Sequence, residues 1–139
     1  MDVRPLTQTY SVAPQIGLDD LRALAEAGFR SVMCNRPDGE DPGQPDFAEV
    51  AAAAKAAGLE SCWIPVVGGP TQEAMQAFCA ALEEMPGPIL AYCRSGTRST
   101  MMWTLAQHGR MTDADILKAT QAAGYDMSGV IQQLQQTRR

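Results

Sequence analysis

Short apolar segments alternate with amphipathic helical patterns along this chain, and this alternation limits the possible fold more than any other feature. The apolar segments that we expect to form strands are 9–13, 29–35, 59–66 and 86–93. The segments with helical spacing are 18–28, 47–58, 71–85, 99–109, 112–124 and 126–139. Strands that alternate with helices of this length are typical of βαβ crossovers and a parallel sheet. We therefore expect an α/β fold, with one domain over residues 1–139 and a largely parallel central sheet flanked by helices.

The composition agrees with one globular domain and argues against several other classes of protein. A chain of 139 residues, 45% of them hydrophobic, is long enough to bury one core. Its net charge is −5 and its Lys and Arg residues are scattered, which argues against a nucleic-acid partner. No segment approaches the roughly 20 apolar residues of a membrane span, and the N-terminal residues lack the pattern of a signal peptide. These observations predict a cytoplasmic protein without a nucleic-acid or membrane partner.

The four cysteines of the chain are expected to play different parts. None belongs to a C-x-x-C pair and the chain has one histidine, so a zinc site is disfavoured and no metal or other cofactor is expected. Cys34, Cys62 and Cys79 fit the habit of free cysteine to pack inside the protein. Cys93 differs, because it ends an apolar segment and is followed by the polar residues "RSGTRS".

The segment "CRSGTRS" has the residue types of an anion-binding loop built around a nucleophile. The backbone N–H groups of residues 94–97 can converge above a helix N-terminus, and Gly96 allows the turn that this requires. Arg98 can close the loop with a planar fork suited to an oxyanion. The same positive field would stabilise a Cys93 thiolate. We therefore predict Cys93 and Arg98 as the catalytic residues. The predicted substrate-binding residues are Arg94, Ser95, Gly96, Thr97 and Ser99.

Two parts of the chain resemble two different groups of proteins. "YCRSGTRS" resembles the active-site loop of single-domain rhodaneses, whereas "IGLDDLRALAEAGFRSVMCNRPDGE" resembles the entry region of dual-specificity protein phosphatases. Their combination is similar to the phosphatase-like domain family of the beta-lactamase-hydrolase-like proteins, over about residues 12–134. "CNRPDGE", "YCRSGTRS" and "AAGYDMSG" are the most specific pieces. This resemblance implies a cysteine-phosphatase-like fold, a Cys93 nucleophile, an Arg98 anion clamp and a place in sulfur metabolism.

Three departures from the phosphatase pattern favour sulfur over phosphorus as the atom attacked. Phosphatases have five residues between Cys and Arg, but Cys93 and Arg98 are separated by four, which predicts a nest too small for phosphate. The segment "IPVVGGPTQE" has no Asp to act as the general acid, and Tyr92 replaces the usual His. We therefore predict a rhodanese-like sulfurtransferase that moves sulfane sulfur from thiosulfate or a persulfide, through a Cys93 persulfide, to a thiol or cyanide.

Two alternatives stay open at this point. The chain can instead be a cysteine-dependent phosphatase with a Cys93 phospho-intermediate, with Asp38 or Glu40 reaching the site as an acid. Solvated turn residues are the favoured interpretation of these two carboxylates, and Arg36 can line the pocket or form a surface ion pair. The second alternative is a non-catalytic anion-binding module. The expected partners are a small anionic sulfur donor or phosphoester, and a sulfide- or persulfide-oxidising enzyme.

Overall fold

A computed structural model describes residues 1–136 as an α/β fold around one five-stranded sheet. The strands are β1 (Arg4–Pro5), β2 (Tyr10–Ala13), β3 (Ser31–Cys34), β4 (Glu60–Trp63) and β5 (Ile89–Tyr92). Their order in the sheet is β1-β2-β5-β3-β4. Only β1, at one edge, runs antiparallel to its neighbour, and the other three pairs are parallel. The predicted α/β class with a largely parallel sheet is confirmed.

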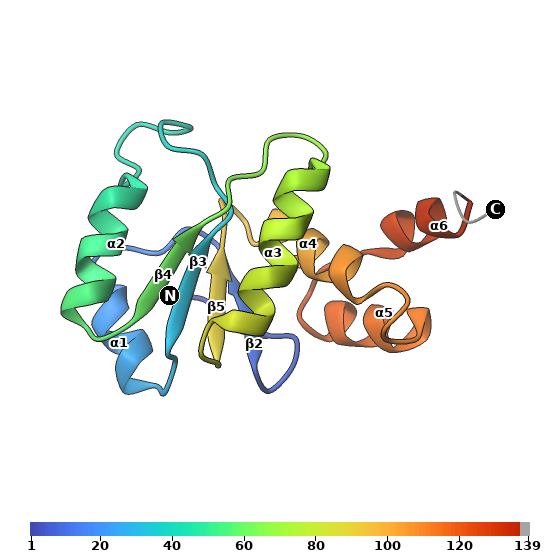
Figure 1. The fold of residues 1–139 in the computed structure, drawn as a ribbon, viewed down its shortest axis with the longest axis horizontal. Coiled ribbons are helices and arrows are strands. Elements are labelled where there is room, and N and C mark those ends of the chain that lie inside the picture. Colours follow the sequence, from blue (N-terminus) through green and yellow to red (C-terminus); the bar gives the residue numbers. More distant parts are fainter. Residues whose placement is uncertain (137–139) are drawn as a thin grey trace.

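Six helices accompany this sheet within residues 1–136, and four of them cover its two faces (Figure 1). They are α1 (Asp20–Glu26), α2 (Phe47–Ala56), α3 (Gln72–Glu84), α4 (Thr97–Gln107), α5 (Asp113–Ala122) and α6 (Ser128–Gln136). Helices α1 and α2 lie on one face, α3 and α4 lie on the other, and α5 and α6 extend beyond α4 (Figure 1). The last helix was predicted over residues 126–139; the observed α6 starts two residues later, at Ser128. Residues 137–139 of that prediction lie outside the described part of the chain. Within residues 1–136, none of these helices is both long and apolar enough to cross a membrane.

The sheet is buried on both faces because successive residues of a strand point to opposite sides. In β3, Val32 packs in the core shared with α1 and α2, whereas the next residue, Met33, packs in the core shared with α3 and α4. Leu90 and Ala91 of β5 divide in the same way. Helices on both faces explain why β2, β3 and β5 are apolar runs rather than alternating polar and apolar residues.

The register of the parallel strands brings their carboxyl ends to one edge of the sheet. Ala13 and Cys34 are both aligned with Tyr92, the last residue of β5. The loops after β2, β3 and β5 therefore start side by side, at the edge where α/β sheets bind ligands. Strand 9–13 is internal rather than at the edge, because the two-residue β1 pairs with it. Cys93 follows the central strand directly.

Candidate active site

Cys93 lies in the turn between β5 and the N-terminus of α4. Its side chain is buried, and its Sγ accepts a hydrogen bond from the Gly96 N–H at 3.1 Å. The first turn of α4, which begins at Thr97, adds N–H groups without an acceptor inside the helix and a partial positive charge. Arg98, in the same turn, carries its positive charge close enough to Cys93 for an electrostatic interaction between the two side chains. The sulfur atom is therefore bound by a backbone N–H beside a helix N-terminus, and it belongs to neither of the two hydrophobic core clusters.

Gly96 is required in this turn for two physical reasons. Its φ of +92° lies in the left-handed region that residues with a side chain rarely adopt. A Cβ added to it would also lie 2.1 Å from the hydroxyl oxygen of Tyr125. That hydroxyl donates a hydrogen bond to the Ser95 carbonyl at 2.9 Å, so the connection between α5 and α6 holds the turn from outside. This role of Tyr125 was not predicted from the sequence, although Tyr125 lies in the segment "AAGYDMSG" that resembles the family.

The other predicted substrate-binding residues divide into exposed and buried ones. Arg94, Ser95 and Thr97 are exposed at the turn, and the hydroxyls of Ser95 and Thr97 are 3.0 Å apart. Ser99 is placed differently from the prediction. Its side chain is fully buried and donates a hydrogen bond to Asn35 Oδ1 at 2.8 Å, so it supports the turn from beneath and does not line the opening.

Asn35 connects the ends of three strands to α4, a role that sequence reasoning missed. Its backbone N–H donates to the Tyr92 carbonyl at 2.8 Å, and its Nδ2 donates to the Ile64 carbonyl at 3.0 Å. With the hydrogen bond from Ser99, one buried amide thus fixes β3, β4 and β5 against the helix that carries Arg98. A buried side-chain amide keeps such a position only when its polar atoms are paired. A polar residue at the end of an apolar strand is the only signal of it in the sequence.

The guanidinium of Arg98 is bound by the loop between β3 and α2. Its Nη1 donates to Glu40 Oε2 at 2.8 Å and its Nη2 donates to Glu40 Oε1 at 2.7 Å. Nη1 also donates to the Val66 carbonyl at 3.0 Å. Glu40 is exposed in the turn, as the favoured interpretation has it, but it is not merely solvated. It is the direct partner of the predicted anion clamp.

Arg36 holds the same loop from beneath, and only 2% of its side chain is exposed. Its Nε donates to Glu40 Oε1 at 2.7 Å, its Nη2 to Asp41 Oδ2 at 2.6 Å and its Nη1 to Gln15 Oε1 at 2.9 Å. A buried guanidinium is stable only when its charge and its donors are paired in this way. Arg36 is therefore neither a surface ion pair nor a free lining residue of the site.

The two arginines hold the pKa of Glu40 far below its usual range, at about 2, chiefly through the hydrogen bond from Arg98. A carboxyl whose pKa is lowered by folding stabilises the folded state above its unfolded pKa of 4.5, and this contribution disappears as the pH falls toward 2. We predict that Glu40→Gln lowers the melting temperature at neutral pH, and that the difference from wild type shrinks as the pH falls from 4.5 toward 2. Thermal melts of both proteins over this range measure it. A difference that does not vary with pH would contradict the ion pair.

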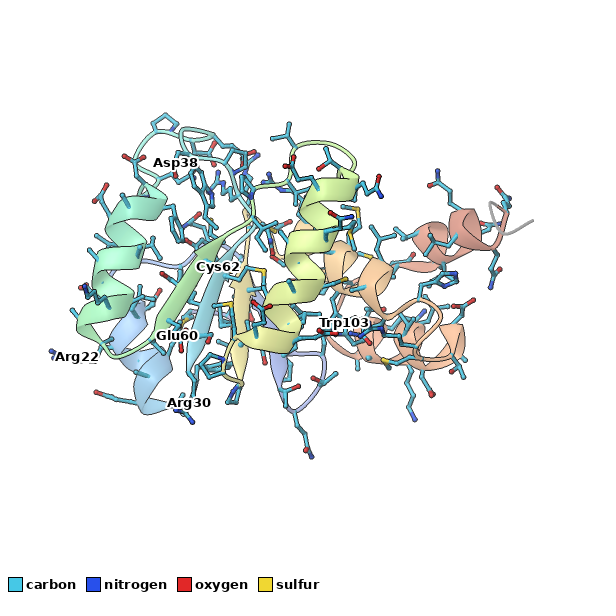
Figure 2. The ribbon with its side chains drawn as sticks, in the orientation of Figure 1. Arg22, Arg30, Asp38, Glu60, Cys62 and Trp103 are labelled. Carbon is cyan, nitrogen blue, oxygen red and sulfur yellow. The ribbon has the colours of Figure 1, made fainter. Side chains whose placement is uncertain are left out.

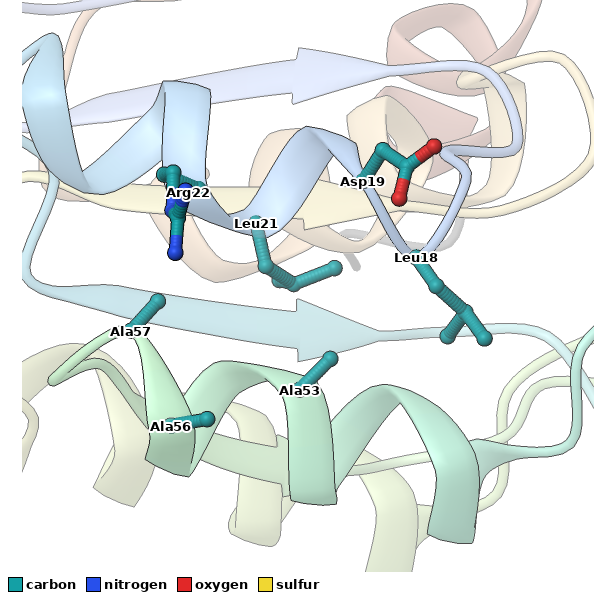
Figure 3. A pocket seen from close by; sticks show the side chains of 7 residues that line it. All are labelled: Leu18, Asp19, Leu21, Arg22, Ala53, Ala56 and Ala57. Carbon is teal, nitrogen blue, oxygen red and sulfur yellow. The ribbon is translucent and has the colours of Figure 1, made fainter.

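The remaining candidate groups do not join the site. Asp38 is exposed on the β3–α2 loop (Figure 2), and its Oδ1 accepts the Phe47 N–H at 2.8 Å at the start of α2. Burial raises the pKa of the Cys34 thiol, and it raises the pKa of Cys62 to about 11. These pKa directions fit the predicted packing role of both thiols. A hollow between α1 and α2 (Figure 3) takes no residue from the Cys93 turn.

The fold and this site define a cysteine-phosphatase-like α/β protein. Residues 2–110 match the family model described as the beta-lactamase hydrolase-like protein, phosphatase-like domain. The chain therefore belongs to this family, as its resemblance predicted.

Individual relatives support this assignment. The chain is 34% identical over 134 residues to a beta-lactamase hydrolase-like protein of Xylella fastidiosa, covering 94% of the chain but only 31% of that protein. A crystal structure from Neisseria meningitidis, described as that of a phosphatase, is 29% identical with a TM-score of 0.87, and 99% of both chains is covered. The active form of the protein named Tk-PTP has a TM-score of 0.73 at 17% identity over 97% of both chains, which shows the fold alone.

The prediction that this chain is a rhodanese-like sulfurtransferase is wrong. The family to which it belongs and the structures that it matches are phosphatase-like, which supports the phosphatase alternative instead. The spacing argument misled because it counted backbone positions, whereas Arg98 lies in the first turn of α4 and carries its guanidinium at the end of a long side chain. A missing acid slows the departure of basic leaving groups but does not exclude phosphoryl transfer. The expected sulfide- or persulfide-oxidising partner stays a prediction.

Proposed function

We propose that this chain is a cysteine-dependent phosphatase that hydrolyses phosphate monoesters. The observation that carries the proposal is the placement of Cys93 Sγ, which accepts a hydrogen bond from the Gly96 N–H at 3.1 Å directly before α4, the helix whose first turn carries Arg98. Such surroundings can bind an anion beside the sulfur atom. Membership of the phosphatase-like family supports the same chemistry.

The proposed reaction has two displacements at phosphorus. The Cys93 thiolate attacks the phosphorus atom, so that an S–P bond forms while the P–O bond to the leaving group breaks. Water then attacks the phosphocysteine, the S–P bond breaks, and inorganic phosphate and the Cys93 thiolate are released. Arg98 and the backbone N–H groups of the turn bind the phosphoryl oxygens, whose charge spreads over them in the transition state.

The described carboxylates favour a particular class of leaving group. Glu40 and Asp41, the acidic residues beside the two arginines, are both held in ion pairs. Because the pKa of Glu40 is held at about 2, this carboxyl is a poor proton donor near neutral pH. A general acid typically contributes about 10²–10⁴-fold to rate. The proposed substrates are therefore phosphate esters whose leaving groups depart readily as anions, such as aryl phosphates.

Hydrolysis of p-nitrophenyl phosphate tests the proposed function. The wild-type protein should release p-nitrophenolate and inorganic phosphate, and Cys93→Ser should abolish turnover because a serine hydroxyl is not ionised near neutral pH. Cys79→Ser makes the same change on helix α3, outside the Cys93 turn, so it is the matched control and should keep full activity. Turnover that survives in Cys93→Ser would show that another group performs the chemistry.

A further inference from the structure

The hydrogen bonds of Arg98 leave one particular edge of its guanidinium available. A guanidinium has five N–H donors. Glu40 takes one N–H of Nη1 and one of Nη2, and the Val66 carbonyl takes the other N–H of Nη1. The two donors left are the Nε–H and the second N–H of Nη2, which lie parallel on one edge and form a fork that suits two oxygens of a phosphate.

We infer that Glu40 is a positioning residue, which holds the end of the Arg98 guanidinium so that its Nε–Nη2 edge is presented to a phosphoryl group above Cys93. This inference rests on the proposed phosphatase function. The place of Arg98 supports it, because the residue lies two positions after Gly96, whose N–H binds Cys93 Sγ, while its Nη1 and Nη2 are held by Glu40 and Val66. Glu40 would act through Arg98 and would not itself touch the substrate.

The support behind Glu40 is rigid enough for this role. Arg36 is almost fully buried, and it donates to Glu40 at 2.7 Å and to Asp41 at 2.6 Å. Its remaining end is bound to Gln15 at 2.9 Å, so all three nitrogens of Arg36 are engaged within the protein. Arg36 therefore fixes the carboxylate, and the carboxylate fixes Arg98. Preorganised geometry of this kind is what lets a charged group stabilise a transition state without reorganising.

If Glu40 instead competes with the substrate for Arg98, its substitution is expected to change phosphate binding in the opposite direction. If its carboxylate occupied the place of the phosphate, the substrate would have to displace it from Arg98. Neutralising Glu40 would then tighten phosphate binding, because the competing anion is removed. A positioning role predicts weaker binding, because Arg98 loses its fixed orientation. The direction of the change therefore distinguishes the two roles.

Inorganic phosphate is the probe for the test. Its inhibition constant against p-nitrophenyl phosphate is measured in the active protein, and its dissociation constant is measured by calorimetry in Cys93→Ser, each with and without Glu40→Gln. In Glu40→Gln we expect the inhibition and dissociation constants of phosphate and the KM for the ester all to rise by about tenfold. The reason is that Gln retains a single acceptor oxygen and no charge. Glu40→Asp, which keeps the charge on a shorter side chain, should fall between Gln and wild type.

A control variant and the activity of the wild type distinguish a failure of the positioning role from a failure of the proposed function. Glu49→Gln makes the same change of net charge in the first turn of α2 and should leave phosphate binding unchanged. Phosphate binding that stays equal or becomes tighter in Glu40→Gln or Glu40→Asp, while the wild type remains active, would overturn the positioning role alone. A wild type that neither binds phosphate nor hydrolyses the ester would overturn the proposed function instead.

Discussion

Arg98→Lys is expected to lower kcat/KM for p-nitrophenyl phosphate by about 10²–10³-fold, the usual cost of losing one preorganised donor to a developing negative charge. Lysine keeps the positive charge, but its ammonium group is a point charge without the fork. It cannot hold Glu40 through two hydrogen bonds of 2.7 and 2.8 Å and also present two further donors to a phosphate. Steady-state kinetics over a range of substrate concentrations measures the loss.

The control for this substitution lies at the opposite end of the sheet. Arg30 precedes β3 and is far from Asp38 and the loops at the carboxyl ends (Figure 2). Arg30→Lys makes the same chemical change there and should leave kcat/KM unaltered. If Arg98→Lys retains wild-type kinetics, the bidentate geometry of Arg98 is not what binds the substrate, and its charge alone suffices.

Gly96→Ala is the second substitution with a large expected effect. The new Cβ would meet the Tyr125 hydroxyl at 2.1 Å, and the residue would have to keep a φ of +92°. Relief of this contact requires a shift either of the Tyr125 ring, which breaks its hydrogen bond to the Ser95 carbonyl, or of the turn that donates the Gly96 N–H to Cys93 Sγ. A displacement of about 1 Å in an active site can cost about 10²-fold in rate. We expect a loss of activity of this size together with a lower melting temperature.

Gly109→Ala separates the cost of the left-handed backbone conformation from the cost of the contact with Tyr125. Gly109 has a nearly identical φ of +90°, but a Cβ there would meet no atom within 4 Å. Its substitution should cost only the left-handed conformation, about 1–2 kcal/mol, and should leave kcat/KM unchanged. If Gly96→Ala destabilises the protein no more than Gly109→Ala and retains activity, the Tyr125 contact does not constrain the turn.

The fold was largely predictable because local patterns determine it. Apolar runs such as 29–35 and 86–93 are long enough to form strands buried on both faces, and β3 and β5 lie within them. The end of β2 was also located correctly, at Ala13. Its place inside the sheet could not be predicted, because β1 consists of only two residues and includes a proline. A strand that short has no periodicity to detect.

The site was predictable only where its residues are neighbours in the chain. The turn from Cys93 to Arg98 carries its chemistry in consecutive residues, so its sequence indicates a nucleophile beside an anion-binding nest. The pairing of Arg98 with Glu40 joins residues 58 positions apart. Charge alone does not reveal it, because carboxylates in loops rich in Pro and Gly are usually solvated. The burial of Arg36 is likewise a property of the folded chain.

The choice between sulfur and phosphorus shows a limit of counting residues between motif positions. Four residues between Cys93 and Arg98 suggested a ring too small for phosphate. The count describes the backbone, whereas the guanidinium is carried on a long side chain that starts in the first turn of α4. The residue count therefore does not fix the position of the guanidinium.

Trapping of the covalent intermediate tests the central claim most directly. The protein is mixed with an aryl phosphate, quenched during turnover and examined by intact mass spectrometry and peptide mapping. We predict one added phosphoryl group, located on Cys93 and absent from Cys93→Ser. Turnover of the ester with no phosphoryl group on Cys93 at any quench time, or with the group on another residue, would contradict the account.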